Sequence, residues 1–242
     1  MKRIITNIIL VVLMIIVGYS TFPRLLQRKE AIDEQKEFQK VVQNVKKENL
    51  VEDLVKQYGN EDIIGFLEID RTNIKYPVVK GRDNKYYLNH GYDGKYQING
   101  ALFLDMDNTE DFMDMNSIIY GHRIASGTLF NQLPKLLEND LYKEAEIRLT
   151  TKDRQETYKT YCIMKVSSDA DYRQIDFESS EAYKDYLEKL IYDSIKTPGK
   201  ELLLPPAKII TLSTCTYEHK NYRLVVVAGL TNTTYFSREK KG

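Results

Sequence analysis

Two neighbouring stretches decide the fold: K-I-I-T-L-S-T-C at residues 208–215 and Y-R-L-V-V-V-A-G-L at 222–230. Both are rich in β-branched and apolar residues, and a short polar loop separates them, which is typical of an antiparallel hairpin. Side-chain alternation predicts that one face of the first strand carries Ile209, Thr211, Ser213 and Cys215. Symmetric closure of the hairpin then places Arg223 opposite Cys215, with their Cβ atoms ~5 Å apart.

Six further strand-like runs precede this hairpin and are separated by Gly, Asn and Asp. They occupy residues 63–69, 74–79, 101–105, 116–121, 146–151 and 156–166. Eight such runs predict a mostly β protein, in which the strands close into an eight-stranded barrel.

Two helices are predicted outside the strands. Apolar residues recur at three- and four-residue spacing over 30–58, which indicates an amphipathic helix broken near Asn49. A second helix is predicted over 179–195, before the Cys215 strand, with Ser179 or Ser180 as its N-terminal cap. Its apolar stripe contains Tyr183, Tyr186, Leu187, Leu190, Ile191 and Ile195.

The N-terminus carries a run of 19 uncharged, mainly apolar residues, Ile4–Phe22. As a helix the run would be roughly 28 Å long, about the thickness of a bilayer core, and no A-x-A cleavage pattern follows it. It therefore predicts an uncleaved signal-anchor, with the membrane as a partner. The predicted organisation is a short cytoplasmic N-terminus (1–3), a transmembrane signal-anchor (4–22), a linker with N-terminal helices (23–58), a catalytic barrel (59–236) and a tail (237–242).

Charge and cysteine content exclude several classes of protein. The 242 residues include 35 basic and 35 acidic side chains, so the surplus of cations that a nucleic-acid binder needs is missing. Two cysteines, Cys162 and Cys215, cannot form a disulfide scaffold or a paired-cysteine zinc site. The acidic run at 105–114 lacks the glycine and the terminal acid of an EF-hand loop, which favours a solvated turn, and we expect no metal and no cofactor.

Cys215 is the candidate nucleophile. It ends a polar face beside a loop, and a cation at Arg223 would lower the pKa of its thiol. Cys162 lies inside the apolar run Y-C-I-M-K-V and is predicted to be an inert core residue. A nucleophilic cysteine also needs a proton partner, and spacing alone leaves His90, His122 and His219 open, with His122 favoured because it follows a strand at the lip of a sheet.

Three motifs in this order resemble the sortases, the cysteine transpeptidases of Gram-positive cell surfaces. They are Y-G-H at 120–122, T-L-S-T-C at 211–215 and R-L-V-V-V at 223–227. The resemblance covers about residues 30–235. The helical N-terminal extension and the long helix before the cysteine strand are similar to class B sortases.

This resemblance implies a site and a reaction. Cys215 would attack a Thr carbonyl in a C-terminal sorting signal of a surface protein and form a thioester. His122 would exchange protons with the leaving and incoming amines, and Arg223 would bind the oxyanion. The acceptor would be an amine of a peptidoglycan precursor. Substrate-lining roles are implied for Ser213, Thr214, Tyr120 and Asn89.

The resemblance also implies a location, a single-pass cell-membrane protein with its catalytic domain outside the cell. Two other functions use the same features. One is a hydrolytic cysteine peptidase of the cell surface, which shares the nucleophile and the base. The other is a non-catalytic, membrane-tethered β-barrel that binds a partner, in which Cys215 would have no chemical role.

Overall fold

The computed structural model describes residues 46–123, 127–199, 205–215 and 222–237, together with scattered positions between 3 and 33. The chain divides into two compact units, Met1–Gln43 and Asn44–Gly242. The described positions of the first unit are helical. The candidate site and the barrel belong to the second unit.

The predicted membrane localisation needs correction. No helix built from the described residues is both long enough and apolar enough to cross a membrane. A span needs about 20 consecutive apolar residues, and the prediction rested on the apolar composition of residues 4–22, several of which lie outside the described residues. A single-pass membrane protein with an extracellular catalytic domain is therefore not supported.

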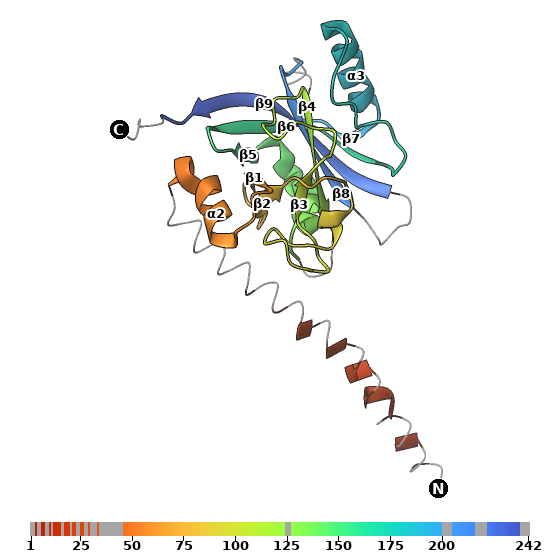
Figure 1. Ribbon diagram of the computed structural model, residues 1–242. Coiled ribbons are helices and arrows are strands. Elements are labelled where there is room, and N and C mark those ends of the chain that lie inside the picture. The colour runs from red at the N-terminus through yellow and green to blue at the C-terminus, as the bar shows by residue number, and fades with distance from the viewer. Residues whose placement is uncertain are drawn as a thin grey trace. The chain divides into compact units, whose positions relative to one another are not determined.

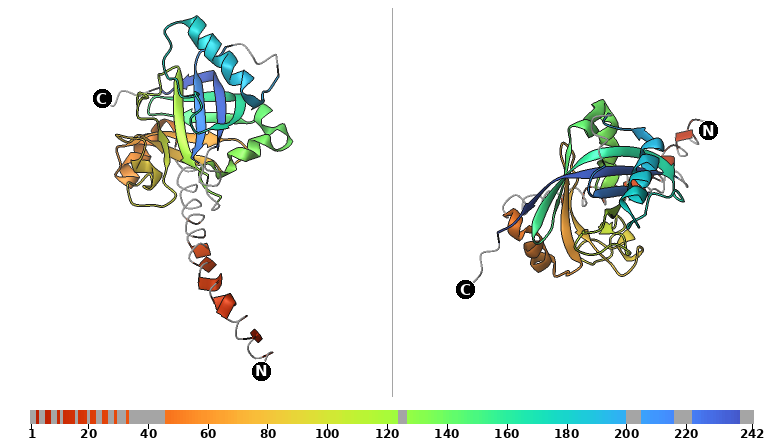
Figure 2. Two further views of the ribbon diagram at one scale, coloured as in Figure 1. Left: turned by 90° about the vertical axis from the view of Figure 1, so that its right-hand side faces the viewer. Right: turned by 90° about the horizontal axis from the view of Figure 1, so that it is seen from above.

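The second unit is a closed barrel of eight strands (Figure 1, Figure 2). Antiparallel pairing of β5 with β6 closes the ring. Each strand coincides with one of the eight predicted runs, so the prediction of a mostly β, eight-stranded barrel is confirmed. Around the barrel the order is β5 (Glu146–Thr150), β1 (Ile63–Ile69), β2 (Lys75–Val79), β3 (Leu102–Leu104), β4 (Asn116–His122), β8 (Ile209–Cys215), β9 (Tyr222–Tyr235) and β6 (Arg154–Ser167).

The helix before the cysteine strand is α3 (Ser180–Tyr192). Its cap is Ser179, whose hydroxyl oxygen accepts a hydrogen bond from the Ala182 amide at 3.1 Å, as predicted. The predicted helical stripe was wrong at Ile195. That residue lies in β7 (Ser194–Lys196), a short strand that pairs with the free edge of β6 and so draws the backbone out of the helix.

The remaining helices are short. The 3₁₀ turn η1 (Lys47–Asn49) leads into α2 (Leu50–Tyr58), which is the part of the predicted helix that follows Asn49. The predicted helix over 30–45 lies outside the described residues, apart from Asp33, and the domain boundaries remain predictions. Two 3₁₀ segments were not predicted: η2 (Tyr86–Leu88) and the kinked η3 (Phe130–Lys143). The first is too short for a periodic signal, whereas the buried Phe130, Leu133 and Leu136 of η3 do recur at helical spacing.

Two apolar clusters hold the second unit together. One fills the barrel, where Ile119 of β4 and Leu212 of β8 both point inward. The other lies on the outer face of the barrel and contains Cys162 of β6 together with Tyr186 and Leu187 of α3. Cys162 is fully buried, so its prediction as a core residue is confirmed.

A buried ionic cluster fixes the start of β8. The Lys208 ammonium donates to Glu156 Oε1 at 2.7 Å and to the Phe112 carbonyl at 2.5 Å. Arg154 Nε donates to the same carboxylate oxygen at 3.0 Å, and the Tyr158 hydroxyl donates to Oε2 at 2.6 Å. Burial lowers the pKa of Lys208, and the contact with Glu156 opposes that effect. Glu156 is thus the anion that the two buried cations share beside the first residue of β8. Asp153 gives Arg154 a second, half-exposed partner at 3.1 Å.

We expect Glu156→Ala to lower the free energy of unfolding by about 3–5 kcal/mol, because it leaves two buried cations without their shared anion. Urea titration of the folded protein measures this. The matched control is Glu144→Ala, which removes an ion pair with Arg71 that is exposed to solvent and should shift the midpoint much less. Equal shifts for the two variants would contradict this account of the cluster.

Candidate active site

A parallel ladder between β4 and β8 organises the site. Its residue partners run from Asn116 beside Ile209 to His122 beside Cys215. Because parallel strands point the same way, β4 and β8 both end at one rim of the barrel. The ladder therefore brings together, at that rim, the histidine and the cysteine that the motifs single out.

His122 is held by a main-chain oxygen. Its Nε2 lies 2.8 Å from the carbonyl oxygen of Leu88 in η2, and only 2% of the residue is exposed. A carbonyl can only accept a hydrogen bond, so Nε2 carries a proton. In the neutral ring, Nδ1 is then the nitrogen that has a basic lone pair.

Arg223 lies at the start of β9, where the hairpin with β8 has the predicted register. Antiparallel partners run from Ile209 beside Gly229 to Ser213 beside Val225. The pairing ends there, two residues before Cys215, so the placement of Arg223 opposite Cys215 stays a prediction. Arg223 Nη1 donates to the Thr214 carbonyl at 3.3 Å, which fixes the guanidinium at the end of the cysteine strand.

The threonine before Cys215 fastens the end of the hairpin. Thr214 Oγ1 accepts a hydrogen bond from the Leu224 amide at 3.0 Å and donates to the Leu224 carbonyl at 3.2 Å. The Thr214 hydroxyl thus makes the two hydrogen bonds with the Leu224 backbone that a neighbouring strand would otherwise make. This fastening keeps β8 and β9 together at the point where Arg223 leaves the ladder.

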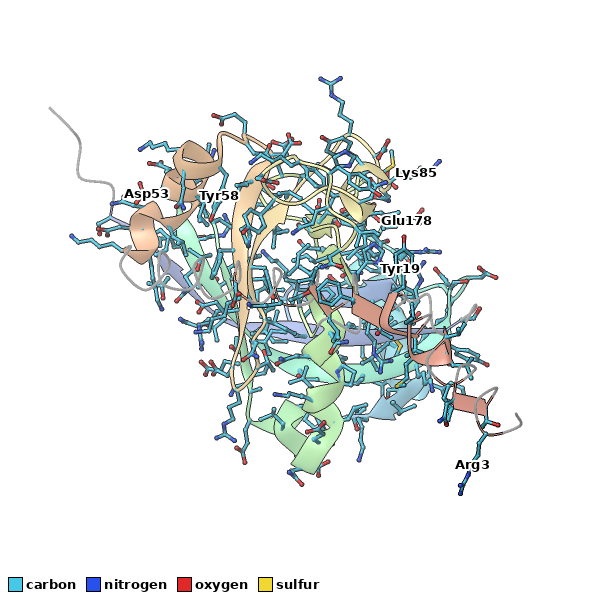
Figure 3. All side chains as sticks on the ribbon, turned by 90° about the horizontal axis from the view of Figure 1, so that it is seen from below. Arg3, Tyr19, Asp53, Tyr58, Lys85 and Glu178 are labelled. Atoms are coloured by element: carbon cyan, nitrogen blue, oxygen red, sulfur yellow. The ribbon has the colours of Figure 1, made fainter. Side chains whose placement is uncertain are left out.

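A polar network that the sequence did not predict lies beneath the site strand. Thr211 Oγ1 donates to Asn116 Oδ1 at 2.8 Å, and Asn116 Nδ2 donates to the Gln174 carbonyl at 2.9 Å. The Tyr172 and Ser213 hydroxyls lie 2.9 Å apart. Figure 3 shows the side chains of this region, with Glu178 marking the segment between β6 and α3 and Lys85 marking the connection between β2 and β3. The network joins the segment between β6 and α3 to both β4 and β8.

Tyr120 connects β4 to the acidic run at residues 105–114. Its hydroxyl donates to Asp105 Oδ2 at 2.7 Å, and Asn84 Nδ2 donates to the same oxygen at 3.2 Å. Burial, with a further contribution from Asp105, raises the pKa of the Tyr120 hydroxyl. Asp105 and Asn108 are buried, so the predicted solvated turn describes only part of this run. The described residues contain no group of three or more His, Cys, Asp and Glu arranged to hold a metal ion.

The residues predicted to line a substrate groove differ in exposure. Ser213, Thr214 and Tyr120 are buried and engaged in the hydrogen bonds given above, whereas Asn89 is exposed next to Leu88. His90 stacks on Tyr86 with ring centroids 3.9 Å apart. His219 lies outside the described residues.

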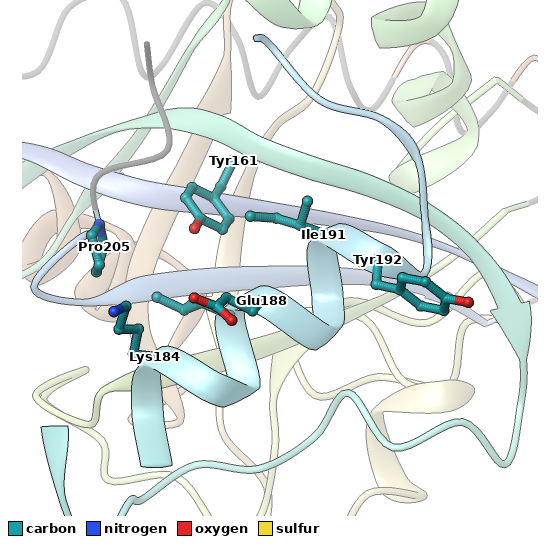
Figure 4. A pocket seen from close by; sticks show the side chains of 7 residues that line it. Tyr161, Lys184, Glu188, Ile191, Tyr192 and Pro205 are labelled. Carbon is teal, nitrogen blue, oxygen red and sulfur yellow. The ribbon is translucent and has the colours of Figure 1, made fainter. Parts of the chain in front are cut away.

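A second concavity lies beside α3. Its lining includes Tyr161 of β6, Ile191 and Tyr192 of α3, and Pro205 (Figure 4). None of the residues that line it is a predicted site residue. The concavity is therefore separate from the His122 and Cys215 rim.

Comparisons with known proteins agree on one family. Residues 67–231 match the family model described as the sortase domain. Sortase B of Listeria monocytogenes is 35% identical over 170 residues, which is 67% of this chain and 66% of that protein. Sortase B of Staphylococcus aureus is 28% identical over 238 residues, or 94% of this chain and 97% of that protein. The solved complex of S. aureus sortase B with substrate superposes with a TM-score of 0.71 at 27% identity, covering 82% of this chain and 93% of that one.

The two cysteines should differ sharply in reactivity. Burial raises the pKa of the Cys162 thiol to about 12, so at neutral pH it is protonated and shielded from solvent. We expect iodoacetamide to modify one cysteine in the folded protein, Cys215, and both in denaturant. Peptide mapping by mass spectrometry identifies the labelled position. Labelling of Cys162 in the folded protein would contradict the assignment of that residue to the core.

Proposed function

Since this chain belongs to the sortase family of cysteine transpeptidases and is of the class B type, we propose a specific reaction for it. It cleaves a C-terminal sorting signal after Thr and transfers the surface protein to an amine of a peptidoglycan precursor. Cys215 is the nucleophile, His122 the proton carrier and Arg223 the oxyanion-binding residue. Anchoring of surface proteins is the general task of the family, and the particular substrates are part of the proposal.

The observation that carries the proposal is the β4–β8 register. A nucleophile and its proton partner must come within hydrogen-bond reach, and adjacent positions on a parallel ladder allow this. The bond from His122 Nε2 to the Leu88 carbonyl supports a role for Nδ1 as the atom that gains and loses the proton.

The first half of the reaction forms a thioester. The Cys215 thiolate attacks the Thr carbonyl carbon, and the electron pair of the C=O bond moves to oxygen. Collapse of this intermediate breaks the C–N bond, and the imidazolium of His122 gives its proton to the leaving amine. The acyl group then remains on sulfur in an activated form.

The second half reverses these steps with a new amine. The acceptor amine attacks the thioester carbon, His122 takes a proton from the nitrogen, and the Cys215 thiolate leaves. Arg223 stabilises the negative oxygen in both halves, because its guanidinium presents several N–H donors from a fixed plane. The bond from Arg223 to the Thr214 carbonyl supports this role by holding the plane beside the nucleophile.

A transfer assay tests the proposal. Sorting-signal peptides that carry a fluorophore and a quencher are incubated with the protein, with and without an amine acceptor. We expect cleavage by the wild type and by Cys162→Ala, none by Cys215→Ala, and a peptide–acceptor product when the amine is present. Cleavage that never yields this product, at any acceptor concentration, would identify a hydrolytic peptidase instead.

Arg223→Lys should be a damaged enzyme although it keeps the positive charge. Loss of one charge-assisted hydrogen bond that strengthens in the transition state lowers turnover by roughly 100- to 1,000-fold. The thiol should still ionise beside the lysine, so its alkylation rate at neutral pH should change much less. Turnover and alkylation are measured on the same preparation. Wild-type turnover in this variant would remove Arg223 from the mechanism.

A further inference from the structure

The segment before α3 presents one cation from a rigid backbone. Tyr172 is 1% exposed, and its hydroxyl lies 2.9 Å from Ser213 Oγ on the site strand. The Tyr186 hydroxyl donates to the Tyr172 carbonyl at 2.6 Å, and Asn116 donates to the next-but-one carbonyl, that of Gln174, at 2.9 Å. The residue between them, Arg173, is therefore held by fixed neighbours on both sides.

The Arg173 side chain lies across Tyr172 and is exposed to solvent. Its Cζ is 5.4 Å from the centroid of the Tyr172 ring, within the range of a cation–π contact. Tyr172 touches Ser213, and Cys215 follows Ser213 two residues later, about 7 Å further along the strand. The charge of Arg173 also acts on the Tyr120 hydroxyl, where it opposes the effect of burial on the pKa. The cation thus lies near β4 and β8, the two strands that end at His122 and Cys215.

No carboxylate of the described residues forms an ion pair with this guanidinium. The neighbouring Asp171 is engaged by Lys189, whose Nζ lies 2.9 Å from its carboxylate. Asp105, on the far side of Tyr120, is buried and accepts hydrogen bonds from Tyr120 and Asn84. The same segment also carries Asp169, Asp176 and Glu178, but no ion pair joins them to Arg173 among the described residues. The exposed guanidinium therefore keeps planar donors that match a carboxylate from outside the chain.

We propose that Arg173 binds a carboxylate of a substrate and makes this enzyme select for an acidic group. The inference rests on the proposed function, since it concerns the same rim. The carboxylate belongs either to an acidic residue upstream of the scissile Thr or to the amine acceptor. In both cases the ordered backbone around Arg173 keeps the cost of fixing the cation low.

Matched substrates and charge-reversed variants test this inference. Peptides that differ only by Glu, Gln or Lys at single positions upstream of Thr are compared by kcat/KM without acceptor. Amine acceptors with and without a carboxylate are then compared in the transfer step on the Gln peptide. The variants are Arg173→Glu and Arg173→Gln. The control is Lys152→Glu, which makes the same charge change at an exposed residue before the start of β6. The opposite end of β6 pairs with Arg223, so Lys152 lies at the end of the strand that is remote from the site.

In the wild type we expect an acidic group at one position to raise kcat/KM by about three- to tenfold, mainly through KM and less at high salt. Arg173→Gln should remove this preference and Arg173→Glu should reverse it, while turnover of the Gln peptide stays within about twofold. Lys152→Glu should keep the wild-type preference. A preference in the peptide series identifies the sorting signal as the source, and one confined to the transfer step identifies the acceptor.

Two outcomes would overturn the inference. One is equal use of Glu, Gln and Lys substrates and of both acceptors by the wild type. The other is a preference that Arg173→Glu leaves unchanged. Both require that the wild type cleaves the Gln peptide. If no sorting peptide is cleaved at all, the proposed function fails first, and binding of the Glu and Gln peptides to Cys215→Ala then tests Arg173 by itself.

Discussion

The parallel pairing of β4 with β8 is the constraint on which the rest of the site depends. Side chains alternate along a strand, so a slip of one residue would send Leu212 out of the barrel and bring Ser213 in. The structure resists this slip from both faces. Ile119 and Leu212 fill the interior, and the Thr211 to Asn116 hydrogen bond crosses the ladder on the outside. The position of His122 beside Cys215 follows from that register.

The outer face of this ladder carries buried polar side chains, although apolar side chains there would need no hydrogen-bond partners. A buried hydroxyl or amide without a partner destabilises a fold by about 1–3 kcal/mol, so each such group here demands a matching one. Thr211, Asn116, Tyr172 and Ser213 supply these matches to one another. The result is a set of directional contacts that fixes the segment before α3 in one position, which apolar packing alone specifies less sharply.

Much of the fold was predictable because its signals are local. Alternating apolar runs predict the strands, a serine before an apolar stripe predicts the start of α3, and the two last runs predict the hairpin of β8 and β9. The missed features depend on contacts distant in sequence. β7 exists because β6 has a free edge there, and the Tyr172 to Ser213 contact joins residues 41 apart. The membrane prediction was wrong because it rested on composition alone, and no helix of the described residues is long and apolar enough to cross a membrane.

Main-chain oxygens, which cannot be recognised in a sequence, hold both His122 and Arg223 of the candidate site. The Leu88 carbonyl holds His122, and the Thr214 carbonyl holds Arg223. Substitution of Leu88 by another residue that keeps the 3₁₀ turn leaves its carbonyl where it is. The geometry around His122 therefore depends on backbone paths more than on side-chain identity.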